Sequence, residues 1–488
     1  MGLGRFGGGV DVARFAHGAG AKVIVTDLAS AEQLSDSLDR LRDLDGIEFH
    51  LGSHDPADFK QADIIIANPA VPGDNEFLEL AHRDNKIVTS QINIFFELCP
   101  AQIIGITGAN GKSTTAALTA HLLRSASDER RVTSDEQVWL SGNIGNQPLL
   151  TILDKIKADD LVVLELSSFQ LEQLAEIRKA PKIALLTNLT PNHLDRHGTF
   201  TNYCAAKENI FKFQKLNDNC PAVSIFNAQD KIAVEWFKKY SEDDGRICIK
   251  FSTSDISKEI RDSFTLPGRA NLSNLAAAIA IAKHFGIDND SIKNSLPEFK
   301  PLPHRLEFVG RINGVSWYND SIATTPQSAI AALEAFDQPK IIIAGGYDKN
   351  LPFDELGQKI AANAKAAIFL GQTAQKIALA INKSLRAKKA FSPERSRRGS
   401  NLKQRNTQSC PERGRRDAIR NMKVELVDSL AQAVRLANRL AESGDVILLS
   451  PACASYDMFD NFQHRGEQFC QLVRALSTER TNSQTQSA

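Results

Sequence analysis

The sequence lacks paired cysteines, an excess of either charge and any long run of apolar residues. Its seven cysteines never form a C-x-x-C pair, which favours free thiols in a reducing compartment and argues against a structural zinc site. Lysine plus arginine equals aspartate plus glutamate at 58 each, so the net charge does not suggest a nucleic acid or an anionic membrane as partner. No apolar run approaches the roughly 18 to 20 residues of a membrane span, and the glycine-rich N-terminus has no signal-peptide core. We expect a soluble cytoplasmic protein that acts on small polar molecules.

The length of 488 residues suggests about three domains. Residues 1–96 contain short apolar segments, "AKVIVTD" and "ADIIIA", around an expected helix, which is typical of a Rossmann-like βαβ domain. Residues 97–303 contain "AQIIGITG", "DLVVLELSS" and "PKIALLTNLT", and apolar strands without alternation indicate a buried parallel sheet. Residues 304–488 add "KIIIAGG", "AAIFLG" and "DVILLSPACAS" between alanine-rich stretches. The predicted fold class is α/β in three domains: Rossmann-like, P-loop ATPase-like and Rossmann-like.

One segment, residues 386–421, fits none of these domains. It is basic and poor in large apolar residues, and "SPERSRRGS" is echoed by "CPERGRRDA". This composition predicts a solvated, disordered insertion in a surface loop. A nucleic-acid-binding arm is the alternative, which the absence of interleaved aromatic residues disfavours.

The stretch "GITGANGKSTT", Gly105 to Thr115, follows an apolar strand and precedes a helical pattern. In that setting backbone N–H groups and a helix N-terminus can bind phosphate oxygens. Lys112 would hold the β- and γ-phosphates, and Ser113 or Thr114 would offer a hydroxyl to magnesium. The generic P-loop pattern requires a glycine at Ile106, so the loop is related to that pattern without matching it.

Further polar residues follow the next apolar strands. Glu165 ends "LVVLE", and His193 follows the strand after it. Such residues lie at the carboxyl edge of a parallel sheet, where ligands bind, and a carboxylate there suits magnesium. Asn271 and Asn274 lie three residues apart on one face of a helix, where they could bind a nucleotide ring or cap the helix.

The first residues contain "GLGRFG", with Gly2, Gly4 and Gly7 in the G-x-G-x-x-G pattern and Asp27 about twenty residues later. By itself this pattern would suggest NAD. The strand that should precede the glycines is absent, because the sequence starts at Met1. Either the start lies too late or the sheet lacks a strand that should be buried.

Together these residues resemble the Mur ligase family over nearly the whole chain. The motifs that carry the resemblance occur in the family's order: "GLGRFG", "TGANGKST", "GNIG", "LELSSFQLE", "NHLDRH", "AAKENIF", "NLSNLAAA", "PHRLE", "NDSIATTP", "GGYDK" and "SPACASYDMFDNFQHRG". The departure at Ile106 is then explained, because the loop resembles the family's T-G-x-N-G-K-[ST]-T version.

The resemblance implies an ATP-dependent amide ligase of peptidoglycan precursor synthesis. Such an enzyme would phosphorylate the carboxylate of UDP-N-acetylmuramoyl-L-alanine and let D-glutamate attack the acyl phosphate, with two magnesium ions and as a monomer. The first glycine pattern would then bind UDP and not NAD. The alternatives are a ligase that adds another stem-peptide residue, a folylpolyglutamate synthase, and a nucleotide-binding module without turnover.

The resemblance also implies the site residues, which come from all three domains. Those implied to be catalytic are Lys112, Glu165, His193 and Lys207. Those implied to bind ATP are Gly108, Asn110, Gly111, Lys112, Ser113, Thr114, Asn271, Asn274, Arg305 and Asp320. Those implied to bind the two substrates are Gly4, Arg5, Phe6, Asp27 and Asn143, and, around D-glutamate, Thr324, Lys349, Ser455 and Phe462. The implied magnesium ligands are Ser113, Glu165, His193 and Lys207, the last as a carbamate.

Overall fold

The computed structural model describes residues 1–4, 7–130, 137–142, 144, 148–348, 351–390 and 422–485. These residues form two compact units, Met1–Thr265 with Leu272–Phe299, and Leu266–Asn271 with Lys300–Ala488. The first unit comprises the first two predicted domains apart from Leu266–Asn271 and residues 300–303, and the division at residue 96 stays a prediction. Within the described residues no helix has both the length and the apolarity needed to cross a membrane.

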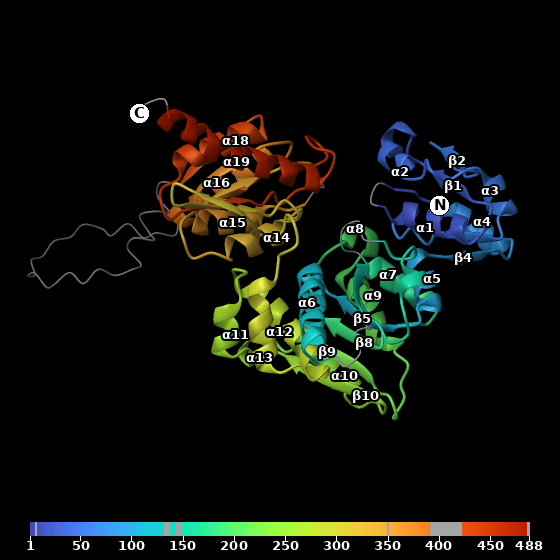
Figure 1. Ribbon diagram of the computed structural model, residues 1–488. Helices are drawn as coiled ribbons and strands as arrows, with labels where there is room; N and C mark the ends of the chain where they lie inside the picture. The colour runs from blue at the N-terminus through green and yellow to red at the C-terminus, as the bar shows by residue number, and fades with distance from the viewer. Residues whose placement is uncertain are drawn as a thin grey trace, which may run out of the picture. The chain divides into compact units, whose positions relative to one another are not determined.

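The N-terminal part of the first unit contains two separate pairs of parallel strands, β1 with β2 and β3 with β4 (Figure 1). The strands are shorter than the apolar segments that predicted them: β1 is Ile24–Asp27 and β3 is Ile64–Ile66. Side-chain caps from Asp55, Asn75 and Ser90 begin three of the helices. The remaining elements are α1 Gly8–Gly18, η1 Glu32–Leu34, α2 Ser35–Asp39, β2 Glu48–Leu51, α3 Pro56–Gln61, α4 Glu76–Arg83, β4 Ile87–Thr89 and α5 Gln91–Leu98.

The central part of the first unit is a six-stranded sheet in the order β10-β9-β8-β5-β7-β6, with every pairing parallel. The strands are β5 Gln102–Thr107, β6 Val138–Gly142, β7 Leu161–Glu165, β8 Ile183–Leu186, β9 Ala222–Asn227 and β10 Arg246–Phe251. All residues of β8 and β9 are buried, so the prediction of a buried parallel sheet is confirmed. The helices are α6 Lys112–Arg130, η2 Leu153–Lys155, α7 Ser168–Glu176, α8 Leu194–His197, α9 Phe200–Lys212, α10 Lys231–Tyr240, η3 Thr253–Asp255, α11 Lys258–Ser263, α12 Arg269–His284, α13 Asn289–Ser295 and η4 Leu296–Glu298.

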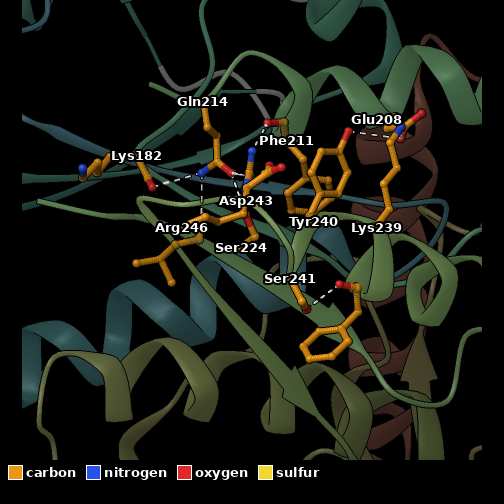
Figure 2. A network of polar contacts seen from close by, with 12 residues as sticks. Lys182, Glu208, Phe211, Gln214, Ser224, Lys239, Tyr240, Ser241, Asp243 and Arg246 are labelled. Atoms are coloured by element: carbon orange, nitrogen blue, oxygen red, sulfur yellow. Dashed lines mark hydrogen bonds and ion pairs between the residues drawn. The ribbon is translucent and has the colours of Figure 1, made fainter. Parts of the chain in front are cut away.

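A polar network fixes the β9–β10 side of this sheet (Figure 2). The amide nitrogen of Gln214 donates to the backbone oxygens of Lys182 and Val223. Its carbonyl oxygen accepts from the Ser224 hydroxyl and the Arg246 guanidinium. Each of these buried polar atoms has a hydrogen-bond partner. The network therefore stabilises this edge of the sheet without the cost of an unpaired buried polar group.

The α1 helix is tied to the central part of the first unit by one buried carboxylate. Asp11, 5% exposed, accepts hydrogen bonds from the backbone N–H groups of Leu149, Leu150 and Thr151 at 2.9, 2.7 and 3.1 Å. It also accepts from the Thr151 hydroxyl and the Gln91 amide, both at 2.7 Å. These contacts fix the segment after β6 against α1.

The second unit is a mixed six-stranded sheet in the order β11-β12-β16-β13-β14-β15. Among the strands that the structure describes here, only β11 and β12 pair antiparallel, and the Asn313–Gly314 turn between them has positive φ at both residues, which suits a tight hairpin. The elements are β11 Glu307–Ile312, β12 Val315–Asn319, α14 Pro326–Leu333, β13 Lys340–Ala344, α15 Asp354–Asn363, β14 Ala364–Phe369, α16 Ala374–Ala390, β15 Lys423–Leu426, α18 Leu430–Leu440, β16 Val446–Leu449 and α19 Phe462–Thr485.

Helices cover both faces of this second sheet. Ile342 and Phe369 pack with α14, α15 and α16, whereas the neighbouring Ile343 and Ile368 pack with α18 and α19. This alternation along buried strands is the pattern of a doubly wound sheet, so the α/β fold class is confirmed.

Candidate active site

The loop between β5 and α6 depends on two glycines. Gly108 and Gly111 have φ values of +146° and +82°, and a Cβ on either would collide with a neighbour. At Gly108 it would lie 1.9 Å from Thr187 Oγ1, and at Gly111 it would lie 2.1 Å from Asn274 Oδ1. The loop is therefore packed against both neighbours through backbone that only glycine can supply.

Hydrogen bonds from the segment after β8 fix the same loop. The N–H of Ala109 donates to the backbone oxygen of Asn188 at 2.8 Å, and the N–H of Asn110 donates to its Oδ1 at 3.0 Å. Thr187 Oγ1 and Asn188 Nδ2 both donate to the backbone oxygen of Asn110. Asn110 is thus held by its backbone, which makes the loop rigid before any ligand binds.

Lys112 and Glu165 meet at the carboxyl edge of the sheet. Lys112 Nζ lies 4.0 Å from Glu165 Oε1 and donates to the backbone oxygen of Ala109 at 3.2 Å. The Glu165 side chain is 3% exposed and that of Lys112 is 18% exposed. The sequence prediction that these two residues share one site is consistent with this distance.

Lys207 of α9 is buried beside this pair. Its side chain donates from Nζ to Thr107 Oγ1 at 3.1 Å and lies 5.0 Å from the centre of the Tyr203 ring. Burial, reinforced by the positive charge of Lys112 and opposed by Glu165, holds the pKa of Lys207 well below its ordinary value. A lysine in this environment favours the neutral amine, which is a nucleophile.

The buried hydroxyl of Thr114 is evidence that the loop binds a polar ligand. Thr114 is 2% exposed, and its Oγ1 has no hydrogen-bond partner among the described residues. A buried hydroxyl without a partner is costly unless something else satisfies it. Thr114 lies in the first turn of α6, two residues after Lys112, where a hydroxyl suits a phosphate oxygen or a hard divalent cation.

His193 immediately precedes α8, is exposed, and lies beside an aromatic cluster. Its ring centre is 5.2 Å from that of Phe169, and its φ of 50° places it in the left-handed region. The cluster also contains His197, which sequence reasoning did not single out. His197 is buried, stacks on Phe169 and contacts Ser168 Oγ at 2.9 Å. Burial lowers the pKa of His197 despite the nearby Glu172, so a neutral imidazole is favoured behind His193.

Arg196 joins this cluster to the N-terminal part of the same unit. Its guanidinium lies 5.5 Å from the centre of the Phe169 ring and donates to the backbone oxygens of Ala70 and Val71. There the glycine pattern is fixed by Asp27, whose Oδ2 accepts from the N–H of Gly4 at 3.0 Å. Asp27, which was predicted to contact UDP, therefore binds the backbone of the glycine loop with one of its carboxylate oxygens.

Asn271 and Asn274 lie in α12, of which the residues up to Asn271 are assigned to the second unit and those from Leu272 on to the first. Asn274 accepts from the Thr115 hydroxyl at 3.4 Å, in contact with the phosphate-type loop. Asn271 donates from Nδ2 to the backbone oxygen of Pro267 at 2.7 Å. Because this amide donates to a carbonyl and does not accept from an N–H at the helix start, the contact is not a helix cap; the binding role of both asparagines stays a prediction.

In the second unit the predicted residues gather at the ends of β12 and β16. Asp320, 5% exposed, accepts from the Ser450 hydroxyl at 2.8 Å and from the N–H of Leu306 at 3.2 Å. Burial raises the pKa of Asp320 to about 7, although Ser450 and Arg305 oppose the shift. Ser455 is buried, and Thr324 is half-buried in the segment after β12.

Arg465 forms hydrogen bonds to these same loops, and the sequence analysis did not identify it as a site residue. It is 2% exposed and donates to the Ser321 hydroxyl and backbone oxygen and to the backbone oxygen of Cys453. The Ser321 hydroxyl in turn donates to the backbone oxygen of Phe462 at 2.8 Å. The only sequence signal was a basic residue within the apolar face of the last helix.

Some predicted features lie outside the described residues. They are Arg5, Phe6, Asn143, Lys349 and residues 391–421 of the predicted insertion. The α16 helix extends to Ala390, so it includes the beginning of the segment 386–421 that the sequence predicts to be disordered.

Family models match two regions of the chain. The Mur ligase middle domain matches residues 106–282, and the Mur ligase, glutamate ligase domain, matches residues 304–453. A UDP-N-acetylmuramoylalanine--D-glutamate ligase from Roseiflexus sp. is 37% identical over 98% of both chains. The protein of the same name from Acetivibrio thermocellus is 36% identical over 94% of this chain and 92% of that one.

Solved structures share the fold. A UDP-N-acetylmuramate-alanine ligase from Thermotoga maritima covers 96% of this chain and 97% of its own, with a TM-score of 0.54 at 17% identity. MurF from Acinetobacter baumannii covers 93% of both chains, with a TM-score of 0.55 at 14% identity. At these identities the likeness concerns the fold alone.

Proposed function

The chain belongs to the Mur ligase family, and we propose that it is the ATP-dependent ligase that joins D-glutamate to UDP-N-acetylmuramoyl-L-alanine. The observation that carries this proposal is the meeting of Lys112, Glu165 and Lys207 behind a glycine loop. It occurs in a chain that is 34–37% identical, over most of its length, to ligases named for that reaction.

The reaction begins with activation of a carboxylate. An oxygen of the alanyl carboxylate attacks the γ-phosphorus of ATP, the bond to the β-phosphate oxygen breaks, and ADP leaves. Lys112 offsets the negative charge on the transferred phosphoryl group, where fixed charges in a dry site contribute most. The N–H groups of Ala109 and Asn110 already donate to Asn188, so the phosphates are assigned to the N–H groups that follow them at the start of α6, in a loop that Thr187 also holds.

The second step forms the amide. The amino group of D-glutamate attacks the acyl-phosphate carbonyl, the bond from carbon to the phosphate oxygen breaks, and inorganic phosphate leaves as the amine loses a proton. We assign the contacts to D-glutamate to Thr324, Lys349, Ser455 and Phe462. The adenosine and phosphates of ATP are assigned, besides the loop, to Asn271, Asn274, Arg305 and Asp320.

Ser113, Glu165 and His193 would hold magnesium, which supplies positive charge to the phosphate oxygens when it is bound. The buried Glu165 carboxylate and the buried Thr114 hydroxyl, which has no partner among the described residues, support this assignment. Lys207 would contribute as a carbamate. Its neutral amine, favoured by the lowered pKa, attacks the carbon of CO₂ and loses a proton, which replaces a potential cation by an anion.

The UDP group is assigned to the N-terminal glycine loop, with Gly4, Arg5, Phe6 and Asp27, and to Asn143. The hydrogen bond from Gly4 to Asp27 supports this by shaping the loop. A monomer in the cytoplasm is the state that we propose, and light scattering after size-exclusion chromatography would test the monomer.

The function is tested by phosphate release. The chain is incubated with ATP, magnesium and UDP-N-acetylmuramoyl-L-alanine, and with D-glutamate, L-lysine, meso-diaminopimelate or L-alanine in separate reactions. We expect release that depends on D-glutamate alone and is lost in Lys112→Met but retained in the matched control, the exposed Lys155→Met. Release that depends on another amino acid, or on none, would contradict the proposal.

A further inference from the structure

The buried imidazole of His197 connects the three elements that position the proposed metal ligands. Glu165 ends β7 three residues before α7 begins, His193 directly precedes α8, and Lys207 lies in α9. His197 is the last residue of α8, and its side chain is 1% exposed. Its contacts reach both α7 and α9, so one side chain links the surroundings of all three ligands.

Both ring nitrogens of His197 bind α7. Nε2 lies 2.9 Å from Ser168 Oγ, and Nδ1 lies 3.2 Å from Glu172 Oε1. A carboxylate can only accept a hydrogen bond, so Nδ1 donates to Glu172, and Nε2 of the neutral ring accepts from the Ser168 hydroxyl. Ser168 is the first residue of α7 and is 2% exposed. The imidazole therefore fixes the first turn of the helix that follows Glu165.

The ring of His197 also contacts two aromatic residues that themselves contact proposed ligands. It stacks on Phe169 with the ring centres 5.4 Å apart, and the Phe169 ring lies 5.2 Å from that of His193. It meets the Tyr203 ring edge-to-face at 5.4 Å, and the centre of that ring lies 5.0 Å from Lys207 Nζ. Two of the three ligands thus pack against rings that His197 holds in place.

The backbone of His197 fixes the turn from α8 into α9. Its oxygen accepts from Asn202 Nδ2 at 3.0 Å and from the N–H of Thr199 at 2.8 Å. Thr199 in turn caps α9 by accepting from the N–H of Asn202 at 3.1 Å. The N–H of His197 donates to the backbone oxygen of His193 at 3.0 Å. The chain from His193 to the start of α9 is therefore held on both sides of His197.

We infer that His197 is a positioning residue for the divalent-cation site, which holds the three proposed ligands at the spacing that a cation requires. Both of its ring nitrogens are already bound by α7, so the imidazole acts through its neighbours and does not contact the cation. The inference rests on the ligands assigned under the proposed function. Residues that orient metal ligands typically change metal affinity or activity by about 10–100-fold when they are replaced.

The test measures Mn²⁺ binding without turnover. Free Mn²⁺ is followed by electron paramagnetic resonance while it is titrated into the full chain with the β,γ-methylene analogue of ATP. In His197→Phe the ring contacts stay but both hydrogen bonds are lost, and we expect the Kd for Mn²⁺ to rise about tenfold. The matched control is His121→Phe, because His121 also makes one polar contact, with the backbone oxygen of Ser295 at 2.8 Å, and one ring contact, with Phe299. Its Kd should equal that of the unchanged chain.

A second variant keeps the test decisive if His197→Phe folds poorly. Ser168→Ala removes only the hydroxyl that binds Nε2, so it should raise the Kd for Mn²⁺ in the same direction but by less. Circular dichroism shows which variants are folded at the temperature of the titration. An unchanged Kd in either folded variant would overturn the inference, as would an unchanged chain that binds no Mn²⁺.

Steady-state kinetics distinguish a positioning role from a general loss of structure. In His197→Phe the Mg²⁺ concentration for half-maximal phosphate release should rise about tenfold. The KM for D-glutamate should stay unchanged, because the contacts assigned to D-glutamate lie in the second unit. A KM for D-glutamate that rises as much as the Mg²⁺ requirement would contradict the positioning role. Since the Mn²⁺ titration contains no amino acid, its outcome is independent of which amino acid the chain joins.

Discussion

Removing the buried carboxylate of Asp11 should strongly destabilise the first unit. In Asp11→Ala the backbone N–H groups of Leu149 and Leu150, residues that are 2% and 1% exposed, lose their acceptor. Thr151 loses two hydrogen bonds and Gln91 loses one. Hydrogen bonds to a charged group contribute about 1.5–3 kcal/mol each.

The five contacts share one acceptor, so their energies do not add. We expect a loss of about 3–5 kcal/mol, which is at the upper end of the effects of single substitutions. With about 2–4 °C per kcal/mol, Tm should fall by about 6–20 °C. Asp11→Asn should lie between, because one oxygen remains to accept from the segment after β6.

Differential scanning calorimetry and urea unfolding followed by tryptophan fluorescence would measure the change. The matched control is Asp39→Ala, whose side chain is 66% exposed and lies 3.9 Å from Arg42; it should cost no more than about 0.5 kcal/mol. If Asp11→Ala and this control have the same Tm, the Asp11 carboxylate does not stabilise the segment Leu149–Thr151.

Four further results are expected. Gly111→Ala should lower kcat/KM for ATP about 100-fold by displacing the loop from Asn274, while Gly18→Ala, where an added Cβ meets nothing within 4 Å, leaves it unchanged. Lys207→Ala should lose most activity and regain part of it with short carboxylic acids; full activity without them would exclude a working carbamate. The pKa of Asp320 is raised to about 7 in the folded state, so folding takes up a proton. The free energy of unfolding should therefore decrease as the pH rises from about 4 to about 7. Urea midpoints at pH 5 and 8 should therefore converge in Asp320→Asn, and an unchanged pH dependence would refute this. Replacing residues 391–421 by a short Gly-Ser linker should leave turnover nearly unchanged, and a loss of solubility would show that this segment packs.

The sequence predicted the sheets well because local patterns determine them. A continuous apolar run such as "IALL" of β8 is buried fully only when both faces of the sheet are covered. The glycine loop was also recognisable, since positive φ at Gly108 and Gly111 requires that residue type locally.

Other parts of the site depend on contacts between residues far apart in the chain. Thr187 and Asn188 hold the loop across 77 and 78 residues, and no local pattern reports such a contact. His197 lies four residues after His193, but His193 precedes α8 with a left-handed φ, so helical spacing does not relate the two residues. Asp11 is a single carboxylate within the apolar pattern of α1. Its hydrogen bonds to Leu149, Leu150 and Thr151 could be recognised only from the folded structure.

Oxygen-18 transfer would test the ligase reaction most directly. UDP-N-acetylmuramoyl-L-alanine labelled with oxygen-18 in its alanyl carboxylate is incubated with ATP, magnesium and D-glutamate, and the released phosphate is analysed by mass spectrometry. An acyl phosphate that D-glutamate consumes predicts one labelled oxygen in each released phosphate. Unlabelled phosphate, or labelled phosphate released equally well without D-glutamate, would contradict the assignment.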